Sequence, residues 1–242
     1  MTTPAPPVRA LARVASEIVR CRRCPRLVAH RELIARVKRR QFRGETYWGR
    51  PLPGFGDPGA RLLIVGLAPA AHGGNRTGRM FTGDQSGDWL FRALHEAGFA
   101  SQARSVSRDD GLVLQDAFIT AAARGAPPDN KPTVEELERC RPFLLRERAL
   151  LGRVRVVVAL GRIAFATVLA TERAAGRALP RPLPRFAHAA VARLGARTLV
   201  ASYHPSRQNT QTGKLSRAML ADVFARARAE IEAGTAGRAP GS

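Results

Sequence analysis

This chain has few acidic residues, almost no lysine and only three cysteines. Nineteen Asp and Glu stand against 40 Lys and Arg, which leaves a formal net charge of +21 in 242 residues. Such a charge repels itself unless a polyanion neutralises it, so a nucleic acid is the expected partner. Lysine occurs only at Lys38, Lys131 and Lys214. A genome that favours arginine codons explains this preference, but it does not explain the shortage of acids.

Long apolar runs are also missing, and the first residues lack the charged and apolar regions of a signal peptide. We therefore expect a cytoplasmic protein without membrane contacts. The length suits a single domain. We assign residues 1–233 to it, with helices and a loop in 8–59, an α/β core in 60–233 and a disordered tail in 234–242.

The odd number of cysteines argues against a disulfide framework in such a protein. Cys21 and Cys24 form a C-x-x-C pair, and Cys140 stands alone. The pair is typical of a metal or iron–sulfur site, or of a redox pair. A thioredoxin-type redox pair follows a strand. Because no strand is predicted before Cys21, we give the redox interpretation little weight.

Short apolar runs alternate with helical patterns along the chain. Strands are predicted over 61–66, 117–121, 154–160 and 198–203. Apolar spacing and a capping-box pattern at residue 133 predict helices over 8–20, 25–40, 86–98, 133–140, 161–171 and 214–233. The strands lack apolar–polar alternation, which is typical of a parallel sheet covered on both faces. The predicted fold class is α/β, a three-layer α/β/α sandwich with a central, mostly parallel four-stranded sheet.

Two loops of unusual composition follow predicted strands, and ligand sites in parallel sheets lie at the carboxyl ends of strands. The first reads Gly66-Leu-Ala-Pro-Ala-Ala-His-Gly-Gly-Asn-Arg-Thr-Gly-Arg-Met-Phe-Thr-Gly-Asp84. The second reads His204-Pro-Ser-Arg-Gln-Asn-Thr-Gln-Thr-Gly-Lys-Leu215. Glycine allows the backbone to approach a ligand closely, and backbone amides can donate to negative charge. We therefore expect the functional site at these loops.

The two loops closely resemble the active-site motifs of the uracil-DNA glycosylase superfamily, and most resemble its family 5, the iron–sulfur branch. The resemblance covers most of residues 15–225. It is also carried by Cys21-x-x-Cys24, Tyr47-Trp-Gly-Arg-Pro51, Ala126-Pro-Pro-Asp-Asn-Lys-Pro132 and Cys140-Arg-Pro-Phe143. All segments occur in order with compatible spacing, which makes their combination specific.

The resemblance implies a monofunctional DNA glycosylase that flips uracil from duplex DNA and hydrolyses its N-glycosidic bond in base-excision repair. Family 5 is also associated with hypoxanthine and other deaminated bases. The expected partner is double-stranded DNA carrying such bases, bound by a monomer at the bacterial nucleoid. No metal is expected in the chemical step. The site loops contain no lysine before Lys214, so a Schiff-base lyase step is not supported.

The resemblance also assigns site residues. His204 would hydrogen-bond uracil O2 and stabilise the leaving anion, an effect that is often the largest catalytic term. Asn75 is expected to orient water, because Leu67 stands where related branches keep a polar residue. The expected base-binding residues are Gly66, Ala68, His72 and Phe81, of which Phe81 stacks on the base. The expected DNA-binding residues are Arg76 and Ser206, at phosphates, and Arg207, Gln208 and Asn209, in a basic loop that would enter the minor groove and fill the gap left by the flipped base. Whether His72 touches the base or braces the loop stays open.

One expected cysteine is missing. Relatives carry four cysteines for a 4Fe–4S cluster, and the resemblance makes Cys21, Cys24 and Cys140 candidate ligands with a structural role. Gly125 stands where the remaining ligand is expected. Three alternatives follow: a cluster held by three cysteines and another ligand such as Asp129, a 3Fe form, or loss of the cluster.

A second hypothesis is a non-catalytic DNA-binding relative that recognises damaged bases or abasic sites. The altered cysteine set motivates it. In addition, Thr120-Ala-Ala-Ala123 lacks an Asn that related branches often carry near the end of the second strand, which removes one contact to the uracil edge. The intact Phe81, Asn75 and His204 favour the enzyme.

Overall fold

The computed structural model describes residues 6–236 and has at its centre a six-stranded sheet of order β1-β3-β2-β4-β6-β5. The inner strands are parallel and comprise β2 (Leu62–Gly66), β3 (Ala117–Ala121), β4 (Val156–Leu160) and β6 (Arg197–Ser202). Two short antiparallel strands, β1 (Phe55–Gly56) and β5 (Val191–Leu194), extend the sheet at its edges. The prediction of a mostly parallel sheet is confirmed, with six strands instead of four.

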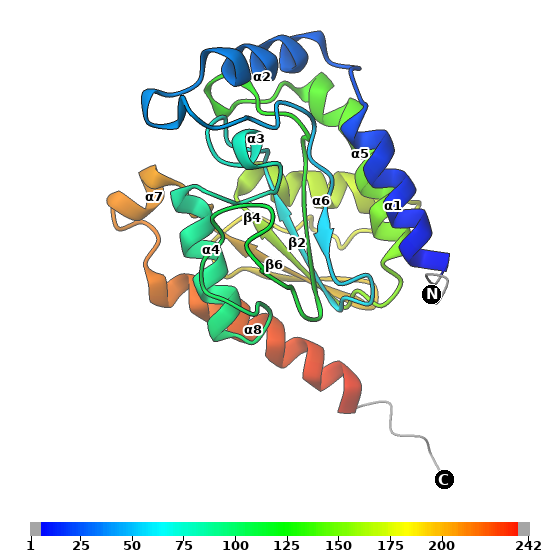
Figure 1. Ribbon diagram of the computed structural model, residues 1–242. Coiled ribbons are helices and arrows are strands. Elements are labelled where there is room, and N and C mark those ends of the chain that lie inside the picture. Colours follow the sequence, from blue (N-terminus) through cyan, green and yellow to red (C-terminus); the bar gives the residue numbers. More distant parts are fainter. Residues whose placement is uncertain (1–5, 237–242) are drawn as a thin grey trace.

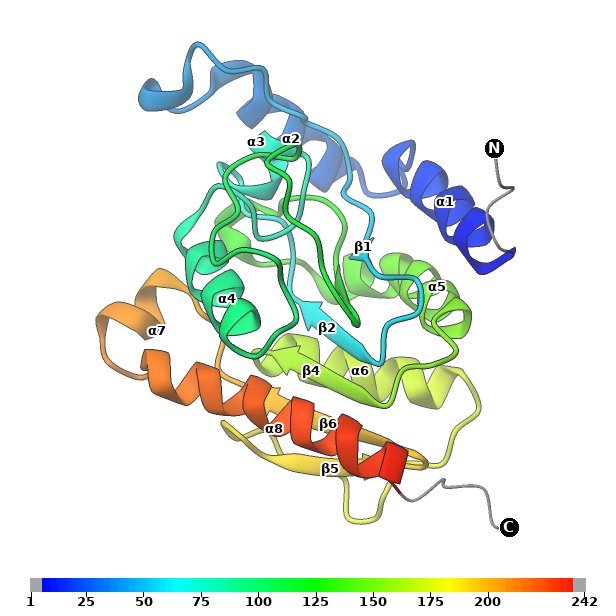
Figure 2. The ribbon, with the colours of Figure 1, turned by 60° about the horizontal axis from the view of Figure 1, so that its bottom comes forward.

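Alternate residues of the inner strands face two separate apolar cores. Leu62 and Ile64 belong to the core shared with α4 (Gln85–Glu96) and α8 (Arg217–Ala236). Leu63 and Val65 belong to the core shared with α5 (Val134–Leu150) and α6 (Arg162–Ala174). Figures 1 and 2 show these helix pairs on opposite faces of the sheet. The predicted α/β/α sandwich is therefore confirmed, because each of the four inner strands buries both of its faces.

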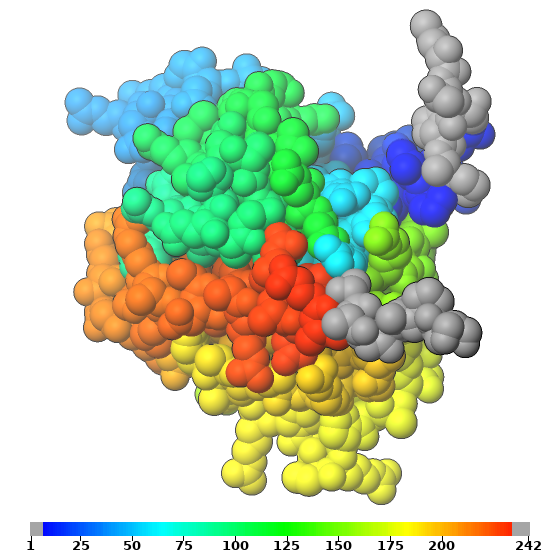
Figure 3. All heavy atoms as spheres, turned by 90° about the horizontal axis from the view of Figure 1, so that it is seen from below, coloured from blue at the N-terminus to red at the C-terminus, as the bar shows by residue number. Residues whose placement is uncertain are grey.

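The helix α8 crosses one side of the molecule, between the segment around α4 and the segment around β5 (Figure 3). It continues through Ala236 and so includes the first three residues of the predicted tail. The rest of that predicted tail, 237–242, lies outside the described residues. None of the helices within residues 6–236 has the length and apolarity that a bilayer span requires.

The N-terminal helices pack on the sandwich from one side. The apolar face of α1 (Pro6–Val19) places Val14 and Ile18 against Phe143 of α5. The next helix, α2 (Pro25–Val37), begins directly after Cys24, with Pro25 in its first turn. It ends three residues before the predicted end, because Lys38 adopts a φ of 58°.

The parallel strands bring their loops together at one edge of the sheet. Hydrogen bonds from Ala122 N to Gly66 O and from Ala123 N to Leu67 O, both 2.9 Å long, continue the pairing of β2 and β3 beyond the strands. Two short helices lie within the predicted site loops, α3 (Gly74–Thr77) and α7 (Arg207–Gln211). Their positions determine which loop side chains point towards each other.

Candidate active site

A cavity of about 1120 Å³ lies at the carboxyl ends of β2, β3 and β6. Of the residues predicted to bind the base or DNA or to act in catalysis, it is lined by Ala68, His72, Arg76, Phe81, His204, Ser206, Arg207 and Gln208. Gly66, Asn75 and Asn209 do not line it. The structure thus brings the two predicted loops together around one space.

Phe81 occupies a strained backbone position that two glycines make possible. Its φ of 54° lies in the left-handed region, which costs energy for a residue with a side chain. A Cβ on Gly66 would stand 2.7 Å from Phe81 Cζ, and a Cβ on Gly87 would stand 1.8 Å from Phe81 O. Gly66 therefore contributes by leaving room for the Phe81 ring rather than by touching a ligand itself.

His204 lies beside Phe81, with 6.0 Å between the ring centroids and 29° between the ring planes. Burial lowers the pKa of His204 to about 4, because the imidazolium would lose its hydration. At neutral pH the ring is therefore uncharged. Its backbone carbonyl accepts a hydrogen bond of 2.8 Å from Nδ2 of Asn209, so Asn209 fixes the backbone of the residue that carries the imidazole.

His72 is braced from the N-terminal part of the chain. Its Nδ1 lies 3.0 Å from the hydroxyl of Tyr47, and the two rings meet edge to face. Burial, and next the positive charge of Arg39, lower the pKa of His72. Arg39 and Phe42 of the same segment also line the cavity. One wall of the cavity is thus formed by residues that precede the sheet.

Asn75 has a different position from the one expected of a water-orienting residue. It is fully buried in α3, and its Nδ2 donates to Arg31 O at 3.2 Å and Ala71 O at 3.4 Å. The short helix begins at Gly74 and turns this side chain towards α2. In the structure Asn75 joins the first loop to α2.

Arg76 lines the cavity but already has several partners within the protein. It donates to His72 O at 2.8 Å and Gly83 O at 2.9 Å, and it pairs with Glu45 at 2.5 Å. Its guanidinium also lies 3.9 Å from the centre of the Phe42 ring. This side chain therefore holds the first loop in shape.

The second loop folds into α7, with Ser206 as its N-cap. Ser206 Oγ accepts from Asn209 N at 3.4 Å. Arg207 and Gln208 are exposed at the rim of the cavity. Across the cavity mouth, Gln85 Nε2 of α4 lies 3.3 Å from Thr210 Oγ1. The exposed side chains of Arg207 and Gln208 can therefore contact the part of a large ligand that lies outside the cavity.

Among the polar residues that line the cavity and were not predicted as site residues are Asp84 and Asn130. Burial raises the pKa of Asp84, although its Oδ1 accepts from Gly87 N at 2.9 Å. Its Oδ2 lies against Gly73, where a Cβ would stand 1.9 Å away. Asn130 follows β3 in a short turn and has a φ of 56°. The motifs around both residues were recognised, but no property of the sequence showed that their side chains face the cavity.

The three cysteines lie together on the N-terminal side. Cys21 follows α1, Cys24 caps α2 and Cys140 lies in α5. Burial raises the pKa of the Cys140 thiol, and Cys24 and Cys21 act in the same direction. Within residues 6–236, however, no three Cys, His, Asp or Glu side chains are arranged to hold a metal ion. Asp129, the other suggested ligand, is exposed and lines the base cavity. The described residues do not fit a cluster that needs four thiolates.

The chain is thus a mostly parallel, three-layer α/β sandwich whose strand-end cavity is lined by an aromatic ring, Phe81, beside the uncharged imidazole of His204. A sequence model of the uracil DNA glycosylase superfamily matches residues 53–228, and the chain belongs to this superfamily.

Comparison with curated relatives shows which branch of the superfamily the chain resembles. A type-5 uracil-DNA glycosylase of Thermus thermophilus is 54% identical over 86% of this chain and 92% of the relative. A type-5 enzyme of Mycobacterium bovis is 51% identical over 86% of this chain and 77% of the relative. One of Pyrobaculum aerophilum is 46% identical over 89% of this chain and 91% of the relative. Within the superfamily, the predicted resemblance to family 5 is confirmed.

Proposed function

We propose that this chain excises uracil from DNA as a monofunctional glycosylase in base-excision repair. The observation that carries this proposal is the pairing of Phe81 and His204 on one cavity, beside glycines that leave room for the aromatic ring. A flipped base needs both a ring to stack on and a donor for the charge that develops as it leaves. The relatives, all named for uracil-DNA glycosylase, support the same substrate.

His204 acts as a neutral hydrogen-bond donor in this mechanism. Because its pKa is held near 4, the imidazole carries one N–H at neutral pH and can donate it to uracil O2. Negative charge grows on that oxygen as the glycosidic bond breaks. A donor that is already in place stabilises the leaving anion without reorganisation of water.

In this mechanism Asp84, in place of Asn75, orients the attacking water. Its carboxylate lines the cavity, and Oδ1 accepts a hydrogen bond from Gly87 N. A carboxylate at this place stabilises the positive sugar and orients the attacking water. Asn130 has both a donor and an acceptor on its amide, which suits the N3–H and O4 of uracil.

The DNA duplex contacts the rim of the cavity. Arg207 and Gln208 are exposed there, and the high net positive charge favours binding to phosphates. No lysine is among the residues that line the cavity within the described chain. Water is therefore the nucleophile, and the product is an abasic site. A DNA substrate also implies action at the nucleoid, and the mechanism needs no more than a monomer.

A release assay on a duplex with a single uracil tests the proposal, with hypoxanthine duplex as a second substrate. The wild type is expected to release free uracil, and His204→Ala is expected to lose this activity. Tight binding of the uracil duplex without release of base would instead identify a non-catalytic DNA-binding relative.

A further inference from the structure

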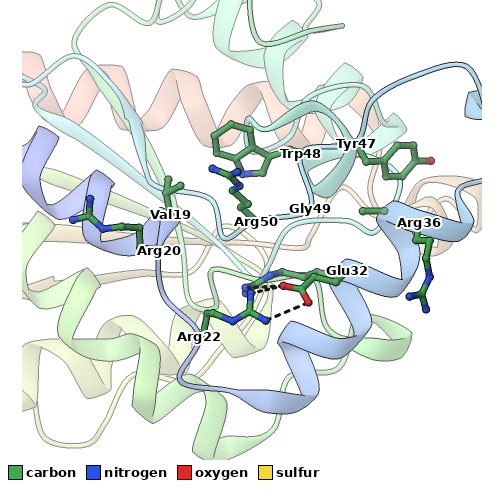
Figure 4. Close-up of a pocket in the computed structure, with 11 residues that line it drawn as sticks. Val19, Arg20, Arg22, Glu32, Arg36, Tyr47, Trp48, Gly49 and Arg50 are labelled. Atoms are coloured by element: carbon green, nitrogen blue, oxygen red, sulfur yellow. Dashed lines mark hydrogen bonds and ion pairs between the residues drawn. The ribbon is translucent and has the colours of Figure 1, made fainter.

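Arginines hold the segment that carries Cys21 and Cys24, which we call the cysteine turn (residues 20–24). Arg22 of this turn pairs with Glu32 of α2 through two contacts of 2.5 and 3.3 Å (Figure 4). Arg31 of the same helix is buried and donates to Cys21 O at 3.4 Å. The turn is thus fixed to α2 without the use of its thiols.

A second set of contacts joins this region to α5, the helix of Cys140. Arg26 donates to both carboxylate oxygens of Glu136, at 2.9 and 2.7 Å. Arg139 Nη1 donates to Arg23 O at 2.7 Å. Bidentate arginine–carboxylate pairs fix both distance and orientation. These contacts connect the cysteine turn and α2 to α5, the helix that carries Cys140.

The missing ligand position lies beside α2. Its preceding residue, Arg124, acts to lower the pKa of the Cys140 thiol, whereas burial raises it. A Cβ on Gly125 would meet Leu27 Cβ at 3.5 Å and Arg31 Nη1 at 3.7 Å, which are ordinary contact distances. Its φ is not in the left-handed region. The backbone at position 125 would therefore accept a cysteine side chain.

We propose that this chain carries no 4Fe–4S cluster, because Gly125 removes one of the four thiolates, and that an arginine clamp replaces it. The clamp consists of Arg22–Glu32, Arg26–Glu136 and the bond from Arg139 to the Arg23 carbonyl. Clusters of this kind are normally held by four cysteines. The inference does not rest on the glycosylase activity, since iron content and folding are measured without it.

Three proteins test the role of Gly125: the wild type, Gly125→Ala and Gly125→Cys. Each is purified anaerobically, incubated with ferrous iron and sulfide, and desalted. The alanine variant adds the same Cβ without a thiol. Only Gly125→Cys is expected to retain iron and sulfide and to show the visible charge-transfer absorption of a cluster. Stoichiometric iron and sulfide in the wild type would overturn the proposal. A Gly125→Cys variant that binds no iron would show that Gly125 is not the missing position.

The clamp is tested by thermal unfolding. Glu136→Gln keeps the size of the side chain but removes the charge that Arg26 contacts, and it is expected to lower Tm by about 5 °C or more. Glu96→Gln is the matched control, because it removes an exposed i,i+4 pair with Arg92 in α4, outside the clamp, and should change Tm little. A chelator should leave the wild-type Tm unchanged. An unaltered Tm in Glu136→Gln, or a chelator-induced loss, would contradict the clamp.

Discussion

Gly87 lies directly under the carbonyl of Phe81, so that a Cβ on Gly87 would stand 1.8 Å from Phe81 O. Because the contact is with backbone, no side-chain rotation can relieve it. Gly87→Ala is expected to displace Phe81 and to lower single-turnover uracil release about tenfold to hundredfold, the range of one lost base-stacking contact. Affinity for undamaged duplex should change little. Gly152→Ala serves as the control, since nothing lies within 4 Å of its Cβ. An equal loss of uracil release in both variants would contradict the stacking role of Phe81.

The lowered pKa of His204 predicts that its ring takes up a proton only at acidic pH. Its folded pKa, about 4, lies below the 6.5 of an ordinary histidine, so the unfolded chain takes up the proton first as the pH falls. The contribution of His204 to stability is complete above pH 6.5 and is lost as the pH falls towards 4. Ring-proton NMR should show no His204 titration between about pH 8 and 5.5. An inflection near pH 6.5 would exclude the neutral-donor role.

Replacing His204 should affect the chemical step. His204→Ala is expected to reduce uracil release by a factor of about 10² to 10³, the typical cost of one lost donor to a developing anion. The exposed His95 of α4 provides the matched control as His95→Gln. Binding of an abasic-site duplex should be similar in all three proteins, because the leaving base is absent from that ligand. A loss confined to binding would contradict the assignment.

The raised pKa of Asp84 predicts how the rate of uracil release falls on the acid side of the pH–rate profile. Burial raises its pKa above the ordinary 3.8, and the ionised form is the one that orients water, so activity should fall at a pH above the usual aspartate range. Asp84→Asn should release uracil slowly at every pH and lose this limb. The exposed Asp109 gives the control variant Asp109→Asn. An unchanged acid limb in Asp84→Asn would assign the titration to another group.

The charge of the chain predicts a steep salt dependence of DNA binding. Each phosphate contact adds about 0.9 to the slope of log K against log salt, and Arg207→Gln should reduce the slope by about one. The loss should be similar for duplexes with and without uracil, since phosphate contacts carry no sequence information. A flat titration of the wild type would argue against phosphate binding at this rim.

The sequence predicts the parallel strands because apolar runs are local signals, and the pair Phe81–His204 follows from the resemblance of the two site loops to the superfamily's motifs. It does not predict the direction of Asn75, which depends on how the turn at Gly74 rotates α3 against α2. Asp84 belongs to a recognised motif, but its burial results from its packing against Gly73. These contacts are set by tertiary packing, which spacing along the chain does not encode.

The hydroxyl of Tyr47 meets His72, and the neighbouring Arg39 and Phe42 line the cavity, yet all three residues precede position 53, where the superfamily match begins. The part of the chain common to the superfamily is therefore open on one side. A shortened protein that starts at that boundary would lack the Tyr47 hydroxyl beside His72 and the side chains of Arg39 and Phe42, so one wall of the cavity would be missing.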